Sequence, residues 1–487
     1  MKSKQHFKQY FSIFLFATTI CAISPLKAQE TWSLKRCVEF GTQNNISVKQ
    51  QELLVQSSSS TYSASKESRM PSVSGTASET FRTGRSTDPF TNQLVTQQVF
   101  SNNFGINAQI TLFNGFQQTN VIKQNEMNYK ANQLDVEQTK RNISLNIANA
   151  YLQVLLSQEL LEAAKAQLNV DSSQIERTEK LLKAGTVAEA QIITLRAQLA
   201  SDQVAVITAQ NQVSFSKLQL MQFMNMPLVE NFQVEKISIE TITNDNLGKT
   251  PNEIYLIAEK NQFSIQSADL RTKSSRISID IAKGAKMPTL TLSGGLNTFY
   301  SSAAPNQRFV VGEGFTTVPS VIGFTDATLT TPITVYKASP NFTQQDNLFI
   351  NQLDFNLGSS FSLNLTIPIY TAGRVKNSIR QARITEQNNE FISQNTKIQL
   401  RQTIEQSYND MKAAASSFEA RKSQVESLEN AFKVTQTRFN VGATNSVDYN
   451  LAKINVDRAK TDLIRSKYEY IFRIKVLDFY QNKPILD

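Results

Sequence analysis

The chain has 487 residues, with 50 Lys or Arg and 41 Asp or Glu side chains, and its formal net charge is +9. Part of this charge lies in a basic N-terminal segment, and the weak positive charge of the remainder argues against a nucleic-acid partner. The only histidine is His6, and beyond that segment Cys37 is the only cysteine. Histidine-dependent catalysis, an intrachain disulfide and a Cys/His zinc site are therefore excluded, and we expect neither a metal nor a cofactor.

Residues 1–28 have the pattern of a secretory signal peptide. Lys2, Lys4 and Lys8 precede an apolar stretch, residues 10–23, and Ala28 precedes a plausible cleavage point. The stretch is shorter than the ~20 residues that a spanning helix needs, so a membrane anchor is the less favoured alternative. No later apolar run is long enough to span a bilayer as a helix, and an exported protein that enters a membrane would then do so with β-strands.

The rest of the chain contains an internal repeat of two similar halves. Residues 104–227 align without a gap with residues 361–484, and Gly185 falls on Gly442. The segments that precede these two blocks align at a shorter offset, which implies an insertion of about 40 residues in the second half. The insertion falls within about residues 300–354, the inserted region, which is rich in Thr, Pro, Gly and Phe without sustained periodicity, and we predict a long loop there.

This duplication divides the chain into four segments. They are the signal peptide 1–28, a first repeat 29–227, a connector 228–250 and a second repeat 251–487. We expect each repeat to run as helix, two strands, long helix, tip and return helix, and the connector to hold a little extended or mixed structure.

Each repeat contains two segments in which apolar and polar side chains alternate. These segments are residues 72–82 and 104–113 in the first repeat and residues 289–299 and 355–369 in the second. Strict alternation predicts strands with one apolar face. The polar faces hold small uncharged groups, as expected of residues that face water inside a barrel, although a soluble sandwich with its apolar face inward is the alternative.

A long helix follows the strands in each repeat. Residues 116–182 contain neither proline nor glycine and could form a helix of about 100 Å. Apolar side chains recur every seven residues at Ile147, Val154, Leu161, Leu168, Ile175 and Leu182, and again at Ile404, Met411, Phe418, Val425, Phe432 and Phe439. Six heptads in duplicate indicate helices wound on helices. Each long helix is expected to end at a glycine, Gly185 or Gly442, before the return helix begins.

Taken together, these residues resemble the TolC-type outer-membrane efflux proteins. The resemblance covers the chain after the signal peptide and includes the strand-to-helix junctions 112–115 and 369–373 and the tip 439–444. It implies a trimeric membrane protein in which each chain gives four strands to a twelve-stranded β-barrel, continued by a long periplasmic α-helical barrel. Four strands cannot close alone and an open sheet edge is not tolerated in lipid, which favours a cyclic oligomer independently.

The function implied by the resemblance is a passive one, without enzyme activity. The chain would be the outer-membrane exit channel of a tripartite efflux or type I secretion system, located in the bacterial outer membrane and reaching into the periplasm. The implied partners are two further copies of the chain, a periplasmic adaptor (membrane fusion protein), an inner-membrane transporter and outer-membrane lipid.

The resemblance also suggests site residues at the helix tips. Asp448 stands where the family places an acidic residue at the periplasmic constriction, although a solvated helix-surface carboxylate is the alternative. Phe439 and Thr444 are, with Asp448, the expected residues of the periplasmic gate. They stand where well-studied members have a tyrosine and an arginine that tie the closed gate, and the sequence leaves open whether the gate is a polar lock. The residues expected to dock the adaptor are Ala184, Gly185, Thr186, Val441, Gly442 and Ala443.

Two other functions remain as alternatives. One is an exported surface scaffold of coiled coils and strands without channel activity, against which the length of segment 355–369 argues. The other is an envelope enzyme that uses carboxylates, but no pair of acidic residues stands out at a junction or a tip.

Overall fold

The computed structural model of the chain describes residues 31–87, 92–96, 98–236 and 246–483. The predicted signal peptide, residues 1–28, lies outside the described residues. The chain divides into two compact units. The strand unit comprises Ser60–Glu126 and Ser274–Glu386, and the helical unit comprises the remaining residues.

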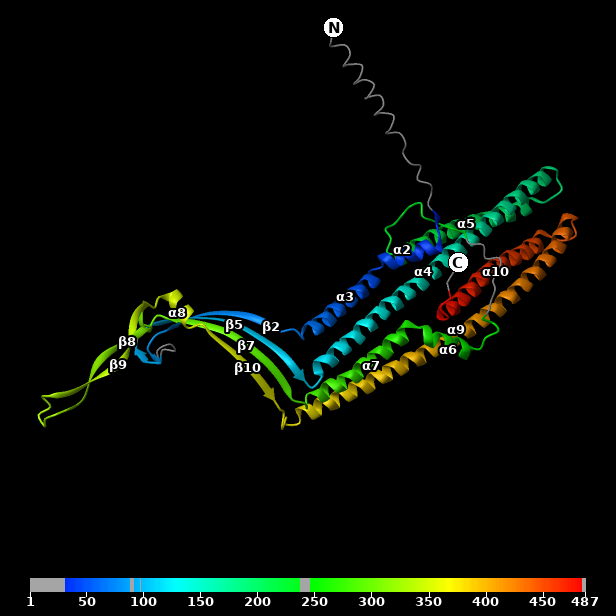
Figure 1. Cartoon of the computed structure of the whole chain (residues 1–487). Helices are drawn as coiled ribbons and strands as arrows, with labels where there is room; N and C mark the ends of the chain where they lie inside the picture. The colour runs from blue at the N-terminus through cyan, green and yellow to red at the C-terminus, as the bar shows by residue number, and fades with distance from the viewer. Residues whose placement is uncertain (1–30, 88–91, 97, 237–245, 484–487) are drawn as a thin grey trace, which may run out of the picture. The chain divides into compact units, whose positions relative to one another are not determined.

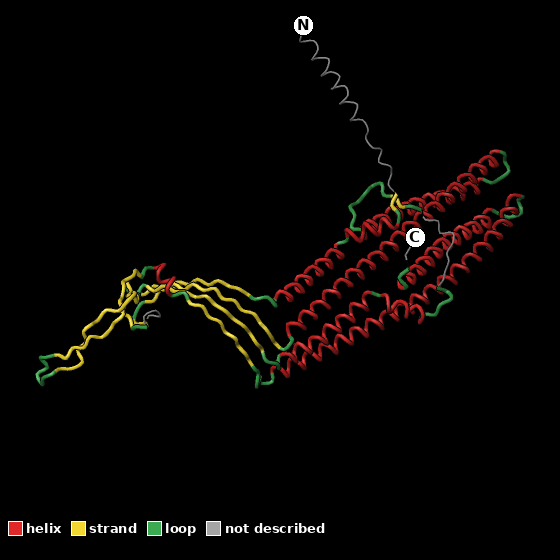
Figure 2. Tube along the Cα trace, viewed as in Figure 1, coloured by secondary structure: helices red, strands yellow, loops and turns green. Residues whose placement is uncertain are grey.

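A four-stranded antiparallel sheet forms the centre of the strand unit. Its strands are β2 (Ser72–Arg82), β5 (Val99–Asn114), β7 (Thr289–Ser301) and β10 (Gly358–Thr366), in the order β10-β7-β5-β2. The β5–β7 ladder joins the two repeats, with Ala108 opposite Gly294, and Figure 2 shows the four strands running together. Within the described residues, β2 and β10 each pair on one side only.

The inserted region is not a loop, and the prediction of a loop for residues 300–354 was wrong. It contains the antiparallel hairpin β8 (Gln307–Phe324) and β9 (Pro332–Asp346), followed by the short helix α8 (Phe349–Phe355). The register shifts between Val311 and Phe315 and again between Val321 and Gly323. Such bulges interrupt the two-residue period along the sequence, which is why periodicity did not reveal the strands.

The predicted strand 355–369 was too long at both ends. Phe355 is the last residue of α8, and β10 covers only Gly358–Thr366. The apolar residues Ile367 and Ile369 continue the alternation beyond the last paired residue, Thr366. The alternating segment of the sequence is therefore longer than the strand. The small pair β3 (Arg85–Thr87) and β4 (Leu94–Thr96) lies between β2 and β5 in the chain.

Helices of matched length repeat along the chain. The two long helices α4 (Gln117–Lys183) and α9 (Arg374–Asn440) have 67 residues each, and the return helices α5 (Glu189–Phe223) and α10 (Ser446–Tyr480) have 35 each. The preceding helices are α2 (Leu34–Asn44) and α3 (Ile46–Glu67) in the first half, and α6 (Pro251–Asn261) and α7 (Phe263–Gly284) in the second.

Two apolar clusters form the core of the helical unit. The first surrounds Tyr151, which is fully buried and whose hydroxyl donates to the carbonyls of Trp32 (3.1 Å) and Glu235 (2.7 Å). These bonds hold the two-residue parallel pair β1 (Thr31–Trp32) and β6 (Gln233–Val234) against α4. The second cluster contains Ile404 and Met411, the heptad equivalents of Ile147 and Val154, and all four side chains are fully buried.

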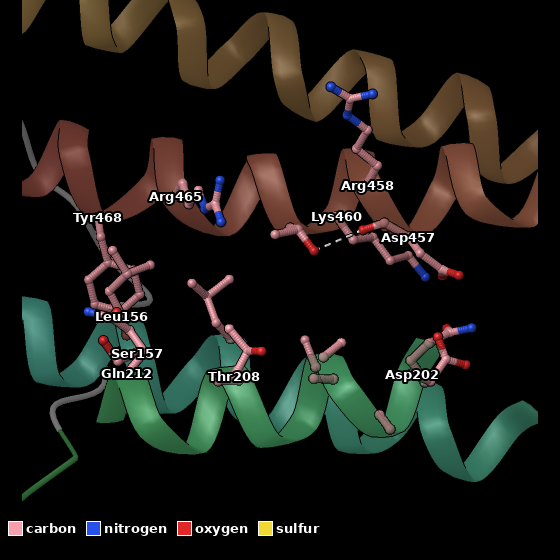
Figure 3. A pocket seen from close by; sticks show the side chains of 18 of the residues that line it. Leu156, Ser157, Asp202, Thr208, Gln212, Asp457, Arg458, Lys460, Arg465 and Tyr468 are labelled. Carbon is pink, nitrogen blue, oxygen red and sulfur yellow. Dashed lines mark hydrogen bonds between the residues drawn. The ribbon is translucent and has the colours of Figure 1, made fainter. Parts of the chain in front are cut away.

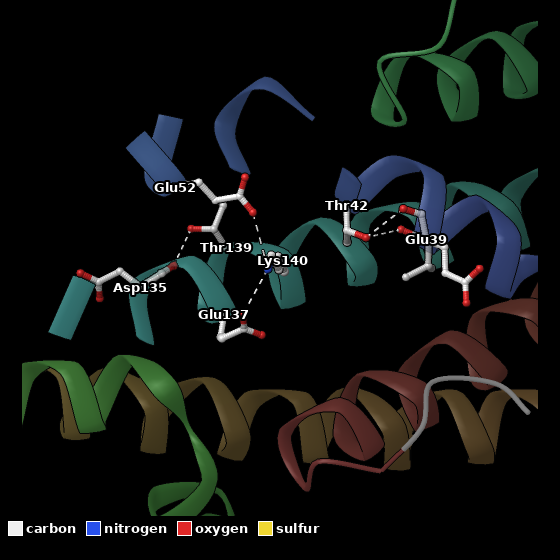
Figure 4. Close-up of polar contacts among 8 residues, drawn as sticks. Glu39, Thr42, Glu52, Asp135, Glu137, Thr139 and Lys140 are labelled. Carbon is white, nitrogen blue, oxygen red and sulfur yellow. Dashed lines mark hydrogen bonds and ion pairs between the residues drawn. The ribbon is translucent and has the colours of Figure 1, made fainter. Parts of the chain in front are cut away.

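Polar contacts on the surface of the helical unit connect α3 with α4. Lys140 of α4 lies 3.7 Å from Glu52 of α3 and 3.2 Å from Glu137, as Figure 4 shows. These side chains are a third to a half exposed, and ion pairs of this kind contribute little to stability because water screens them. The apolar clusters, not these pairs, therefore hold the helices together.

None of the helices in the described ranges combines the length and the apolar character needed to cross a membrane.

Candidate functional site

The helix tips have the same backbone geometry in both repeats. At the first tip the amide of Gly185 donates to the carbonyl of Leu182 (2.9 Å), and the amide of Thr186 donates to that of Leu181 (3.0 Å). At the second tip Gly442 donates to Phe439 (3.1 Å), and Ala443 donates to Arg438 (2.8 Å). This pair of bonds is the Schellman ending of a helix, which satisfies carbonyls that the last turn would otherwise leave free.

Both glycines adopt the left-handed conformation that this ending requires. φ is +71° at Gly185 and +78° at Gly442, a region that residues with a Cβ rarely occupy. A Cβ at either position would meet no atom within 4 Å. The left-handed backbone conformation, which would strain any residue with a Cβ, is therefore enough to explain glycine at both positions. The space beside each glycine is also open.

The six predicted docking residues are exposed in the chain. Ala184, Gly185 and Thr186 are exposed at the first tip, and Val441, Gly442 and Ala443 are exposed at the second. Val441 is an apolar side chain with 75% of its surface accessible. The first tip offers a hydroxyl instead, and Thr186 Oγ1 donates to the carbonyl of Leu181 (2.9 Å).

The three predicted gate residues belong to two different contacts. Thr444 Oγ1 donates to Asp448 Oδ2 (3.1 Å), and the Asp448 amide donates to Asn445 Oδ1 (2.8 Å). Asp448 is exposed and lies in the first turn of α10, where the helix dipole favours a carboxylate. Phe439 instead stacks on Tyr449 with the ring centroids 4.7 Å apart. Phe439 thus helps to hold α9 against α10 and does not take part in the Thr444–Asp448 hydrogen bond.

A buried charged cluster lies further along the helices, and sequence reasoning missed it. Lys453 of α10 forms an ion pair with Asp171 of α4, and both side chains are almost fully buried. Asp202 of α5 is 7% exposed, and its Oδ1 accepts from Gln198 Nε2 (3.0 Å). Its Oδ2 has no hydrogen-bond partner among the described residues.

Burial perturbs the acid–base properties of this cluster. It lowers the pKa of Lys453, whose charge is costly to bury. It raises the pKa of Asp202 and of Asp457, and the neighbouring Asp202 charge raises the pKa of Asp457 further, while Lys453 and Lys460 oppose the rise. The sequence signal that could have revealed the cluster lies three residues after each apolar heptad position. There α4 carries polar residues such as Asp171 in place of apolar ones.

A cavity of about 1170 Å³ lies between α4, α5 and α10 and opens beside this cluster. Figure 3 shows Asp202, Thr208 and Gln212 on one side and Asp457 and Lys460 on the other. The lining mixes small apolar, amide and charged side chains. The described residues contain no group of three or more His, Cys, Asp or Glu side chains that could hold a metal ion. These side chains can form hydrogen bonds and charge interactions, and such interactions suit contact with a helix or with water.

The fold is shared with solved structures of outer-membrane proteins. The structure of VceC from Vibrio cholerae is similar with a TM-score of 0.71 and 15% identity, covering 93% of this chain and 96% of that one. The CmeC outer-membrane channel of Campylobacter jejuni is similar with a TM-score of 0.69 and 15% identity, covering 93% of this chain and 87% of that one.

The sequence shows the family as well as the fold. The outer membrane efflux protein family matches residues 42–226 and 255–473, one block in each repeat. The chain belongs to this family, and the protein is located in the outer membrane. The outer membrane protein TolC of Escherichia coli (strain K12) is 24% identical over 343 residues, which are 68% of this chain. The match spans only 59% of the length of that relative.

Proposed function

We propose that the chain is the outer-membrane exit channel of a tripartite efflux or type I secretion system. The observation that carries the proposal is a sheet with two unpaired edges, β2 and β10, joined to two long helical hairpins of equal length. Unpaired edges cannot face lipid, and three copies related by cyclic symmetry would close them into a twelve-stranded barrel. The helical hairpins would then form a periplasmic barrel.

The protein in this proposal performs no chemistry. It supplies a water-filled conduit across the outer membrane and the periplasm, while an inner-membrane transporter provides the energy and a periplasmic adaptor connects the two. The exposed tip residues Ala184, Gly185 and Thr186, with Val441, Gly442 and Ala443, would be the adaptor contacts. In keeping with such a surface, the tips combine a rigid backbone ending with small side chains.

The periplasmic gate in this proposal centres on Asp448. Three copies of this exposed carboxylate would meet near the axis, each accepting the Thr444 hydroxyl. Phe439 would support the gate indirectly, because it stacks on Tyr449, the residue of α10 that directly follows Asp448. A channel with a ring of carboxylates at its narrowest point favours cations.

The test begins with the full-length protein purified from outer membranes in detergent. We expect chemical crosslinking to give a species of three chains and planar bilayers to show ion conductance. A strain that lacks the protein should lose export and regain it from a plasmid copy. A monomer that stays in solution without detergent, and that conducts no ions, would instead support the surface scaffold.

A further inference from the structure

The hairpin β8–β9 has one face on which large apolar side chains predominate. Directly paired residues of an antiparallel ladder share a face, and Val311 pairs with Phe342, Phe315 with Pro340, and Pro319 with Tyr336. The large apolar side chains of this face are Phe309, Val311, Phe315, Val321, Tyr336 and Phe342. We call these six residues the apolar face. The paired positions between them carry no charged side chain.

The apolar face is uncovered in the single chain. Phe309 and Tyr336 are each 71% exposed, and Phe315 is 76% exposed. Within the described residues, β8 and β9 form a two-stranded sheet and pair with no other strand. An isolated two-stranded hairpin is marginally stable in water, and an exposed apolar surface of this kind is typical of an interaction site. Something must therefore cover this face in the working protein.

The base of the hairpin is fixed to the sheet by buried polar contacts. The Asn347 amide donates to the Asn306 carbonyl (2.7 Å), and Asn347 Nδ2 donates to the Pro305 carbonyl (2.8 Å). Gln352 of α8 accepts from the Ser301 amide (3.0 Å) and donates to the Asn347 carbonyl (3.0 Å). Figure 1 shows the two strands running together away from α8. The hairpin therefore leaves the sheet from a defined base.

The position of the hairpin in the chain indicates what covers it. It lies between β7 and β10, and β10 is the edge strand that would pair with the next copy in the proposed trimer. The hairpin is thus connected, through the short helix α8, to the strand at which the proposed interface closes the sheet. Its apolar face also lacks the basic residues that would bind anionic headgroups. A second copy of the same surface is the occupant that fits.

We propose that the apolar faces of the three hairpins pack against one another at the outer mouth of the channel and narrow its exit. The proposal rests on the trimeric channel proposed above. It assigns to the inserted region a role as an apolar collar at the end of the barrel opposite the helices. Apolar constrictions hinder the passage of water and ions, so the collar would restrict flow through the exit.

Single cysteines test the packing in the full-length trimer in native membranes. Phe315→Cys lies on the apolar face, and Thr316→Cys, the matched control, is the exposed neighbouring residue on the opposite face. The wild-type protein controls for Cys37, which is buried. With a short bismaleimide, we expect crosslinked chains from Phe315→Cys and a several-fold lower yield from Thr316→Cys. Equal yields, or none from Phe315→Cys in an intact trimer, would overturn the collar.

Two further readouts separate the competing occupants. A fluorophore on Phe315→Cys that is strongly quenched by lipid-attached quenchers would place the face in the bilayer and overturn the proposal. The double variant Phe315→Ser, Tyr336→Ser should raise the single-channel conductance by about two-fold or more, because polar groups remove the barrier to water. Unchanged conductance would also count against it. If no trimer forms at all, the proposed function fails together with the collar, whereas a trimer without crosslinks overturns the collar alone.

Discussion

The ion pair between Lys453 and Asp171 is buried in the helical unit, and its loss should therefore be costly. Lys453→Met would leave Asp171 charged and buried without an opposite charge, and only its hydrogen bond from Gln167 Nε2 (3.1 Å) would remain. We therefore expect a loss of about 3–5 kcal/mol in the free energy of unfolding. Urea unfolding followed by far-UV circular dichroism measures the loss. The matched control is Lys460→Met, because Lys460 and Glu429 form a half-exposed pair worth about 0–1 kcal/mol.

The double variant Lys453→Met, Asp171→Leu completes this test. Removing both charges leaves neither member of the pair as an isolated buried charge, so most of the lost stability should return. The part that does not return is the attraction between Lys453 and ionised Asp457. A double variant as unstable as the single one would show that the site requires its charges for another reason.

Asp457 gives the helical unit a dependence on pH. Burial and the Asp202 charge raise its pKa in the folded state above the value in the unfolded chain. The ionised carboxylate therefore opposes folding at neutral pH, and stability rises as the pH falls through the folded-state pKa toward the unfolded one. We expect Asp457→Asn to stabilise the protein at neutral pH and to reduce this acid-side gain. Unfolding curves at neutral and mildly acidic pH, compared with those of the wild type, would contradict the assignment if both proteins changed equally.

At the scale of elements, the sequence predicts those helices and turns that depend on local sequence patterns. The heptads at Ile147 and Ile404 identified the two long helices, and these side chains are fully buried. The tip glycines were found because a left-handed helix ending needs no tertiary information. The hairpin β8–β9 was missed because its bulges break the strand period. The pairing of Lys453 with Asp171 depends on which helices become neighbours, and no local pattern encodes that.

The second tip allows the structural and docking roles of glycine to be separated. Gly442→Ala should cost on the order of 1 kcal/mol, because φ at this position is +78°. Ala443→Trp adds bulk next to the glycine without this strain, and we expect it to abolish adaptor pull-down and export while the trimer persists. The matched control is Ala413→Trp, an exposed alanine of α9 about 45 Å away along the helix. Export that survives Ala443→Trp with a normal trimer would remove this tip from the docking surface.

At the scale of the whole molecule, Asp448 should determine ion selectivity. If three carboxylates form a ring at the constriction, Asp448→Asn should reduce the preference for cations and weaken block by multivalent cations in planar bilayers. Thr444→Val is the control, because it removes the hydroxyl that donates to Asp448 but keeps the charge. Unchanged selectivity in Asp448→Asn would leave this residue as a solvated carboxylate on the helix surface.

The equal lengths of α4 and α9, and of α5 and α10, restrict how such a chain can change over evolutionary time. Because the two long helices have the same number of residues, an insertion in one of them would make the two hairpins unequal in length. Growth of the helical hairpins therefore requires four coordinated additions of whole heptads. The β8–β9 region carries no such constraint, and a single insertion there lengthens the protein without disturbing any other element. New length, and with it new surface, can enter this chain most easily at the β8–β9 hairpin.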